Sequence, residues 1–248
     1  MGSPQTDRRP RVAIAVAPNG GRRTKVDHAA LPVSPEELAE TAHAAVEAGA
    51  AMIHVHVRDR NGDHLLDADA YREAISAIRA AVGNGIVVQI TTEGLGRYAP
   101  EVQMAVVREV QPEAASLALR ELVPDAGHEA AFAELLQFMT RSGMAPQIIL
   151  YAPEEAVRLA GLIRRGVVPA DDIPVLYVLG RYAEGQRSDP ADLLPFAAPG
   201  QPRFQHWRVC AFGPRAPTCV PMGPFLAGHV PVGRATTRFP PDPTPPAP

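Results

Sequence analysis

Two histidines, His54 and His56, occupy alternate positions of one apolar segment, and Arg58 and Asp59 follow directly. Side chains on a β-strand alternate between its faces, so both imidazoles point the same way, about 6.6 Å apart along the chain. Two imidazoles on one face can bind one divalent metal ion, and a catalytic zinc usually has three protein ligands and one open position. The alternative is a pair of hydrogen-bonded core histidines, and the pattern itself leaves both interpretations open.

Polar residues also stand at the ends of other apolar segments. Thr91 and Gly94 follow one such segment, and Ser116 stands within the next one along the chain. The two hydroxyls could orient a carbonyl or carboxylate group, and a glycine permits close approach of a ligand. Arg181 follows a further segment and could bind an anion or be solvated. Each of these residues could equally be an ordinary capping or strand residue. No Ser-His-Asp order, Cys-x-x-Cys pair or phosphate-binding loop is present.

Short apolar segments rich in Val and Ile recur along the chain at intervals of roughly thirty residues, which is typical of buried parallel strands joined by helices. The predicted strands are residues 12–17, 52–57, 86–90, 114–119, 147–151, 175–179, 207–212 and 229–232. The predicted helices run from 35 to Gly49, from Asp67 to Gly83, over 102–110, 131–139 and 154–163, and briefly from Asp189.

The first helix has the clearest start, because Ser34, Pro35 and Glu37 form a capping box with proline at the first helical position. Strands and helices in alternation imply right-handed βαβ units. Eight strand candidates therefore predict an α/β fold, a (β/α)8 TIM barrel, over residues 12–233. The lack of a Gly-x-Gly-x-x-Gly turn argues against a dinucleotide-binding sheet. In such a barrel the chemistry lies at the carboxyl ends of the strands.

Composition limits the function classes. A net charge of −3 gives no reason to expect a nucleic-acid partner, and no apolar run approaches the length of a membrane span. The polar start of the chain predicts a cytoplasmic protein, and two cysteines cannot form a disulfide framework. Eleven of the 27 prolines lie in residues 214–248. We expect residues 1–11 and the proline-rich residues 234–248 to be disordered tails.

Several motifs taken together resemble the β-keto acid cleavage enzymes, also called 3-keto-5-aminohexanoate cleavage enzymes, from about residue 12 to 233. The segments that carry the resemblance are Asn19-Gly20-Gly21-Arg22-Arg23-Thr24, Asp27-His28, Ser34-Pro35-Glu36-Glu37, His54-Val55-His56-Val57-Arg58-Asp59, Gln89-Ile90-Thr91-Thr92, Val178-Leu179-Gly180-Arg181-Tyr182, Trp207 to Gly213 and Gly228-His229-Val230.

The resemblance implies a TIM barrel that is usually oligomeric and binds a divalent metal, typically Zn²⁺. His54 and His56 match the family's metal histidines. The implied reaction is a retro-Claisen type acyl exchange, in which a β-keto acid and acetyl-CoA give acetoacetate and a new acyl-CoA. Thr91 and Ser116 match catalytic, substrate-contacting positions. Gly94 matches a further contact, and Arg22 replaces the glutamate that would receive a distal ammonium group.

The end of the chain departs from the family pattern. Pro231 stands in place of the catalytic arginine, Ala235 in place of the third metal ligand, a glutamate, and Thr236 in place of the adjacent acid. Glu93, Asp59 or water are then the remaining candidates for a third ligand. The abrupt departure suggests a change of reading frame near Gly233 and the loss of a normal final helix. A catalytically inactive CoA-binding or oligomer-forming relative is therefore the alternative, with a metal-dependent aldolase-like lyase as a more distant one.

Overall fold

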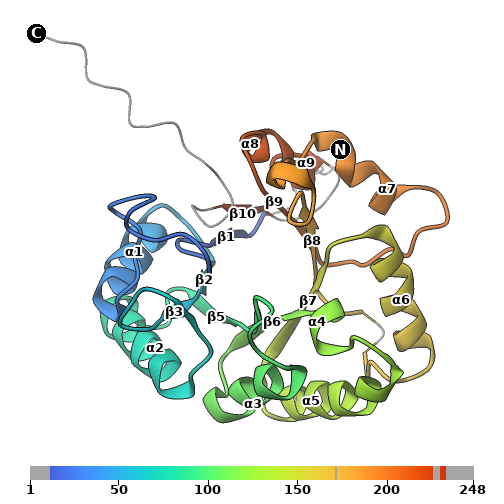
Figure 1. The fold of residues 1–248 in the computed structure, drawn as a ribbon, viewed down its shortest axis with the longest axis horizontal. Coiled ribbons are helices and arrows are strands. Elements are labelled where there is room, and N and C mark those ends of the chain that lie inside the picture. The colour runs from blue at the N-terminus through green and yellow to red at the C-terminus, as the bar shows by residue number, and fades with distance from the viewer. Residues whose placement is uncertain (1–11, 171, 226–229, 233–248) are drawn as a thin grey trace, which may run out of the picture.

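Eight parallel strands form the centre of the molecule. The structure, a computed structural model, describes residues 12–170, 172–225 and 230–232. The strands are β1 (Ile14–Val16), β2 (Met52–Val55), β5 (Val87–Thr91), β6 (Ala114–Ala118), β7 (Ala145–Leu150), β8 (Val175–Leu179), β9 (Trp207–Ala211) and β10 (Val230–Val232). They pair in the order β10-β1-β2-β5-β6-β7-β8-β9. In Figure 1 the two ends of this order, β9 and β10, lie beside each other, so the sheet curls into a barrel. The predicted (β/α)8 fold is confirmed.

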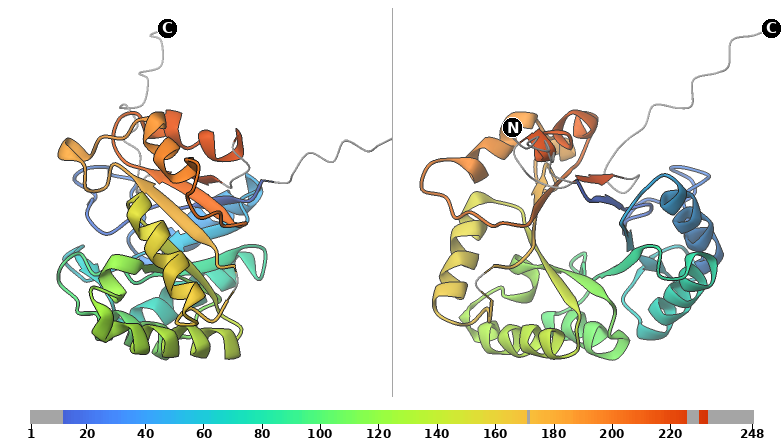
Figure 2. Two further views of the ribbon diagram at one scale, coloured as in Figure 1. Left: turned by 90° about the vertical axis from the view of Figure 1, so that its right-hand side faces the viewer. Right: turned by 180° about the vertical axis from the view of Figure 1, so that it is seen from behind.

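Helices surround the ring of strands (Figures 1 and 2). They are α1 (Pro35–Glu47), α2 (Ala68–Val82), α3 (Pro100–Val110), α4 (Leu119–Leu122), α5 (Glu129–Arg141), α6 (Pro153–Arg164), α7 (Leu194–Ala197), α8 (Ala216–Cys219) and α9 (Met222–Phe225). Three 3₁₀ turns, at Ala126–His128, Glu184–Gln186 and Pro190–Leu193, complete the connections. Among the described helices, none is long and apolar enough to cross a membrane.

The predicted capping box starts α1. Ser34 Oγ accepts a hydrogen bond from the backbone N–H of Glu37 at 3.3 Å, and Glu37 Oε2 accepts one from the backbone N–H of Ser34 at 3.1 Å. These bonds satisfy donors that the first turn of a helix leaves free. The helix then buries Leu38 and Ala42 against the barrel. Since α1 follows the loop after β1, its fixed start also positions that loop.

A short hairpin that the sequence pattern did not predict lies between β2 and α2. Its strands, β3 (Val57–Arg58) and β4 (His64–Leu65), are antiparallel, and Arg58 Nη1 donates to the carbonyl of Gly62 at 2.7 Å. Val57 therefore belongs to this hairpin, and β2 ends before His56. The predicted strand 52–57 is thus two strands with a break at the second histidine.

The last described part of the chain closes the barrel. Two single-turn helices, α8 and α9, occupy the proline-rich connection, and β10 pairs with β1 so that Ala15 stands opposite Pro231. The predictions for Ala235 and Thr236, the frame change near Gly233, the missing final helix and the two tails all concern residues outside the described ranges.

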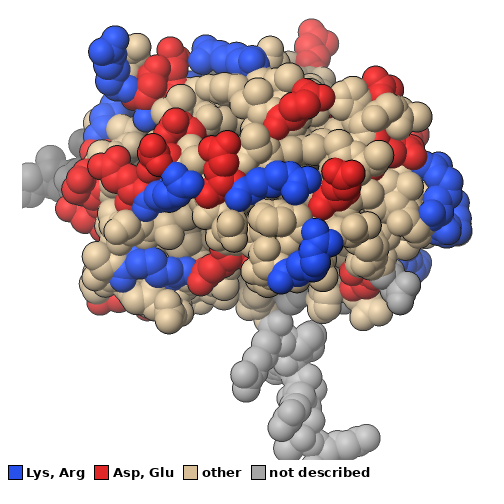
Figure 3. Space-filling view, turned by 90° about the horizontal axis from the view of Figure 1, so that it is seen from below, with Lys and Arg blue, Asp and Glu red and all other residues tan. Residues whose placement is uncertain are grey.

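Charges of both signs mix on the outer surface. On the face shown in Figure 3, Lys and Arg side chains lie among Asp and Glu side chains. Surface pairs such as Arg72–Asp69, at 2.5 Å, and Arg165–Glu129, at 2.6 Å, illustrate the pattern elsewhere in the described chain. Exposed pairs of this kind contribute little stability, typically less than about 1 kcal/mol each.

Candidate active site inside the barrel

A cavity of about 160 Å³ runs into the barrel from the carboxyl ends of the strands. Residues two apart on the same strand line it, because alternate side chains of a barrel strand point inward. These rows are Ala15, Ala17 and Asn19; His54 and His56; Gln89, Thr91 and Glu93; Gln147, Ile149 and Tyr151; Leu176 and Val178; and Arg208, Cys210 and Phe212. Arg22 and Arg23, from the loop after β1, and Arg181, after β8, line the cavity as well.

The two predicted histidines meet at the wall of this cavity. His54 Nε2 and His56 Nε2 lie 3.2 Å apart, with the ring planes at 79° to each other. A tetrahedral zinc with Zn–N bonds of about 2.0–2.1 Å separates two ligand nitrogens by about 3.3 Å. The observed spacing fits two imidazoles that share one divalent ion, and without the ion the same distance fits a hydrogen bond between the two rings.

The surroundings keep these nitrogens available. Gln89 Oε1 lies 2.9 Å from His54 Nδ1 and accepts its hydrogen, which leaves the lone pair of His54 on Nε2. Burial is the largest cause that lowers the pKa of His54, and burial also puts the pKa of His56 well below its ordinary value. Both rings are therefore neutral at neutral pH, as metal ligands must be.

Two protein ligands are what the described chain offers. Among residues 12–170, 172–225 and 230–232, no group of three or more His, Cys, Asp and Glu side chains is arranged to hold a metal ion. Glu93 Oε2 faces the other nitrogen of His56, Nδ1, at 3.9 Å. Asp59 instead accepts the backbone N–H groups of Asn61 and Asp63 in the β3–β4 turn. Neither carboxylate stands where a third ligand would join the pair.

The loop after β1 is anchored directly to the second histidine. Asn19 is buried, and its side chain donates to the carbonyl of His56 at 2.7 Å and accepts its N–H at 3.2 Å. Gly21 lies close above the same residue: a Cβ there would stand 3.4 Å from His56 Nδ1 and 3.3 Å from Glu93 Oε2. Arg58 donates to the carbonyls of Gly20 and Arg23 and so fixes the rest of the loop. The Asn-Gly-Gly segment thus holds the histidine and the cavity rim together.

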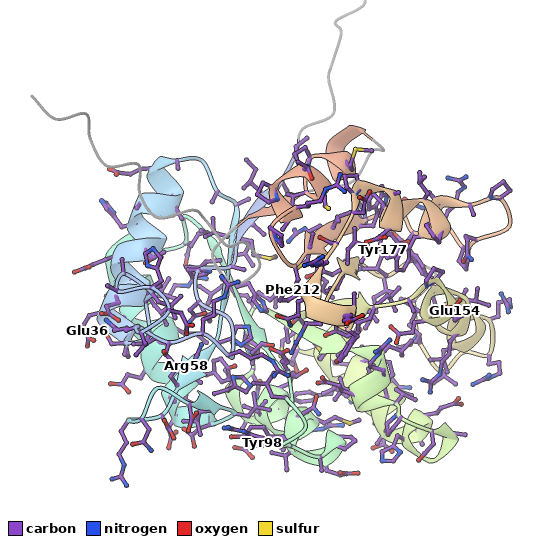
Figure 4. All side chains as sticks on the ribbon, turned by 45° about the horizontal axis from the view of Figure 1, so that its top comes forward. Glu36, Arg58, Tyr98, Glu154, Tyr177 and Phe212 are labelled. Atoms are coloured by element: carbon purple, nitrogen blue, oxygen red, sulfur yellow. The ribbon has the colours of Figure 1, made fainter. Side chains whose placement is uncertain are left out.

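A buried ion pair crosses the mouth of the cavity. Arg181 Nη2 donates to Glu93 Oε1 at 2.9 Å, and Arg181 is only 8% exposed. The guanidinium also lies 5.4 Å from the ring centre of Phe212. Figure 4 shows Phe212 toward the centre of the ring of strands and Glu154, on α6, at the periphery. His64 Nε2 donates to the carbonyl of Glu93 at 2.6 Å. Glu93 is therefore held from two sides and has one oxygen facing His56.

The chain matches the sequence model of the beta-keto acid cleavage enzymes over residues 11–237. It belongs to this family. The enzyme named 3-keto-5-aminohexanoate cleavage enzyme from Fusobacterium nucleatum is 33% identical over 107 residues, 43% of this chain and 39% of that one. The enzyme of the same name from Acetoanaerobium sticklandii is 25% identical over 233 residues, 90% and 82% of the two chains. The 3-oxoadipate:acetyl-CoA acetyltransferase of Cupriavidus necator is 32% identical over 105 residues, 42% and 36% of the two chains. The matched segments thus span well under half of two of these three relatives.

Solved structures with the same architecture carry other chemistry. The 3-dehydroquinate dehydratase of Enterococcus faecalis superposes with a TM-score of 0.57 at 12% identity, over 92% of both chains. The type I 3-dehydroquinate dehydratase of Clostridium difficile reaches 0.59 at 12% identity, over 90% of this chain and 83% of that one. At this identity the likeness concerns the barrel and says nothing of activity.

The structure separates the other residues predicted from the cleavage-enzyme motifs into two groups. Thr91 and Arg22 line the cavity with the histidines, Thr91 buried and Arg22 exposed at the rim. Thr91 Oγ1 accepts the backbone N–H of Glu93 at 3.0 Å, so its own hydrogen remains to be donated. Ser116 and Gly94 lie outside the cavity lining. Ser116 Oγ is buried without a hydrogen-bond partner among the described residues, and a Cβ on Gly94 would meet Gln103 Nε2 at 2.6 Å.

The sequence motifs do not predict the roles of three cavity residues, Gln89, Gln147 and Arg208. Gln89 belongs to the Gln89-Ile90-Thr91-Thr92 motif, and its side chain orients His54. No motif includes Gln147. Its Oε1 accepts a hydrogen bond from Gln89 Nε2 at 3.2 Å. Arg208 lies within the predicted strand 207–212, and no motif assigns it a role. Strand alternation, applied to every predicted strand rather than to the histidine strand alone, would have placed all three inside the barrel.

Proposed function

We propose that this chain is a metal-dependent β-keto acid cleavage enzyme, which exchanges the acyl group of a β-keto acid with acetyl-CoA and gives acetoacetate and a new acyl-CoA. The observation that carries the proposal is the convergence of His54 Nε2 and His56 Nε2 at 3.2 Å inside the barrel of a chain that belongs to this family. Zn²⁺ or another divalent ion held by the two imidazoles would supply Lewis-acid stabilisation of negative charge on the substrate's oxygens.

Acetyl-CoA enters the proposal as co-substrate through the relatives' names. The Cupriavidus necator relative is named an acetyl-CoA acetyltransferase, and one from Paraburkholderia graminis, 33% identical over 108 residues, is named an acetyl-CoA acetone transferase. We further propose a cytoplasmic homo-oligomer. Exposed Val12 and Ile14, at 43% and 37%, support assembly, since exposed apolar side chains close together in the chain are a candidate contact surface.

The chain's own residues would hold and orient the acid. Thr91 has a hydroxyl hydrogen to donate into the cavity because Glu93 N–H occupies its oxygen. Arg22, at the rim, would attract an anionic substrate rather than one with a distal ammonium group. Ser116 and Gly94 remain proposed substrate contacts, although neither lines the cavity.

A second candidate is an inactive relative that binds CoA or serves in an assembly. The absence of a third ligand among the described residues favours it, as do Pro231 and Ala235, which replace an arginine and a glutamate expected from the family resemblance. On the first candidate we expect weaker metal binding and slower turnover than in a complete relative, and on the second candidate no turnover.

Metal analysis separates the two candidates. The purified protein is dialysed, its zinc content is measured, and acetyl-CoA consumption is followed with a panel of β-keto acids. With micromolar free Zn²⁺ in the dialysis buffer, we expect bound metal in the wild type, loss of it in His54→Ala, and no change in His43→Ala, whose imidazole is exposed on α1. Metal that is retained by His54→Ala would contradict the assigned site, and bound metal without acetyl-CoA consumption would favour the inactive relative.

A further inference from the structure

Arg208 stands at the inner end of the cavity with no carboxylate beside it. It lies on β9, and its Nη1 contacts the thioether sulfur of Met52 on β2 at 3.0 Å, across the barrel. A thioether is a weak acceptor that leaves a guanidinium with most of its donors free. No ion pair joins Arg208 to an Asp or Glu within the described residues, and burial alone lowers its pKa.

The depth of Arg208 follows from the order of the lining residues. Along β9 the cavity wall reads Arg208, Cys210 and Phe212 toward the carboxyl end, so the guanidinium begins deepest in its row. Barrel interiors are usually filled by Val, Ile and Leu in layers. Here the innermost cavity residues of β1, β5 and β7 are Ala15, Gln89 and Gln147. The small alanine leaves space, and the two glutamines provide amide groups.

The other cations of the cavity do not need an anion in the same way. Arg181 has Glu93, Arg22 is exposed to solvent at the rim, and Arg23 follows it in the same rim loop, partly exposed. Arginines outside the cavity, such as Arg79 with Glu113 and Arg120 with Glu155, also have carboxylate partners. A half-buried charge without a partner costs stability, and a ligand that carries the opposite charge would offset that cost.

We propose that Arg208 binds a carboxylate of the β-keto acid, so that the acid lies with this carboxylate at the inner end of the cavity and its remainder toward His54, His56 and the mouth. The inference rests on the proposed function for the substrate class. A planar guanidinium with free donors suits a carboxylate, which it can bind through two hydrogen bonds. The amides of Gln89 and Gln147 make the surrounding wall polar.

Binding measured without turnover tests the inference. Isothermal titration calorimetry compares acetoacetate with methyl acetoacetate, which keeps the keto group and lacks the charge. Wild type, Arg208→Met, Arg208→Lys and the surface control Arg165→Met are titrated. We expect wild type and the control to prefer acetoacetate and Arg208→Met to lose about 10- to 100-fold in its affinity, since a hydrogen-bonded charge pair is lost. Arg208→Lys should retain part of the preference, and no variant should change the binding of the ester.

The outcomes separate this inference from the proposed function. Acetoacetate affinity that is unchanged in Arg208→Met overturns the inference, as does a wild type that binds acid and ester equally or not at all. A fall in the melting temperature of Arg208→Met without loss of preference would show a structural role and also overturn it; we expect the melting temperature to stay level or rise. Binding that depends on Arg208 in a protein that consumes no acetyl-CoA supports the inference and contradicts the proposed function.

Discussion

His54 can present Nε2 to the cavity because Gln89 holds the opposite ring nitrogen. Replacement of Gln89 by leucine removes the acceptor at 2.9 Å and frees the ring to rotate or change tautomer. Loss of such a supporting hydrogen bond typically costs 10- to 100-fold in metal affinity. We therefore expect Gln89→Leu to weaken Zn²⁺ binding by about 10-fold or more, measured by competition with a chromogenic chelator.

Gln147→Leu is the matched control for that experiment. It removes an amide from the same wall, but Gln147 contacts Gln89 and not the imidazole. Its effect on Zn²⁺ affinity should be several-fold smaller. Equal losses in the two variants would mean that the polarity of the wall, rather than the orientation of His54, governs metal binding.

At the residue scale, spacing along one strand predicts which side chains share a face. It does not predict contacts between side chains that come from different strands of the barrel. The facing of His54 and His56 follows from their two-residue spacing and holds in the structure. The Glu93–Arg181 pair joins residues 88 positions apart, and no local pattern encodes such a contact. Gly94 has a packing reason of its own to lack a side chain, because a Cβ there would meet Gln103 on α3, and its role as a substrate contact stays a prediction.

At the element scale, the start of α1 yields a prediction with a defined pH dependence. Hydrogen bonds from Lys25 and from the backbone N–H groups of Val33 and Ser34 lower the pKa of Glu37 to about 2. A lowered folded-state pKa contributes stability that is present above the unfolded value, near 4.5, and is lost as the pH falls toward 2. Glu37→Gln should therefore lower the free energy of unfolding by about 1 kcal/mol at pH 7.

The difference between the two proteins should shrink between pH 4.5 and pH 2, because the wild-type carboxyl becomes protonated there. Urea unfolding at several pH values measures it. Glu40→Gln, an exposed change on the same helix, serves as the control and should have little effect. A Glu37→Gln penalty that stays constant down to pH 2 would contradict the role of the ionised cap.

Elements with a long apolar pattern were predictable and very short ones were not. The strand predicted at 175–179 coincides with β8, and the capping box placed the start of α1 at Pro35. The two-residue strands β3 and β4 lack an apolar run, since arginine and histidine supply half of their residues. Leu119 is buried, so it prolonged the apparent strand at 114–119, although the backbone turns there into α4.

At the scale of the whole molecule, the repeat of strand and helix predicted the barrel, but closure depends on a contact between the two ends of the chain. Ile14 pairs with Val230 more than 200 positions away, and the sequence pattern is weakest there because Pro231 interrupts the last apolar run. A proline removes one ladder donor from a strand. The seam between β9, β10 and β1 is therefore the part of the barrel whose integrity most needs a direct measurement.

Cys210 provides that measurement because it lies on β9 with its side chain in the barrel interior. It is 8% exposed, and burial raises the pKa of its thiol to about 12. At pH 8 a thiol with that pKa is about 0.01% thiolate, whereas a free cysteine, with a pKa near 8.5, is about 25% thiolate. In Cys219→Ala, which leaves Cys210 as the one cysteine, we expect iodoacetamide to react about 1000-fold more slowly with the native protein than with the urea-unfolded protein. Rapid labelling of the native variant, with its circular dichroism unchanged, would contradict the buried surroundings of Cys210 and show that solvent reaches the inner face of β9, through the cavity mouth or through an open seam.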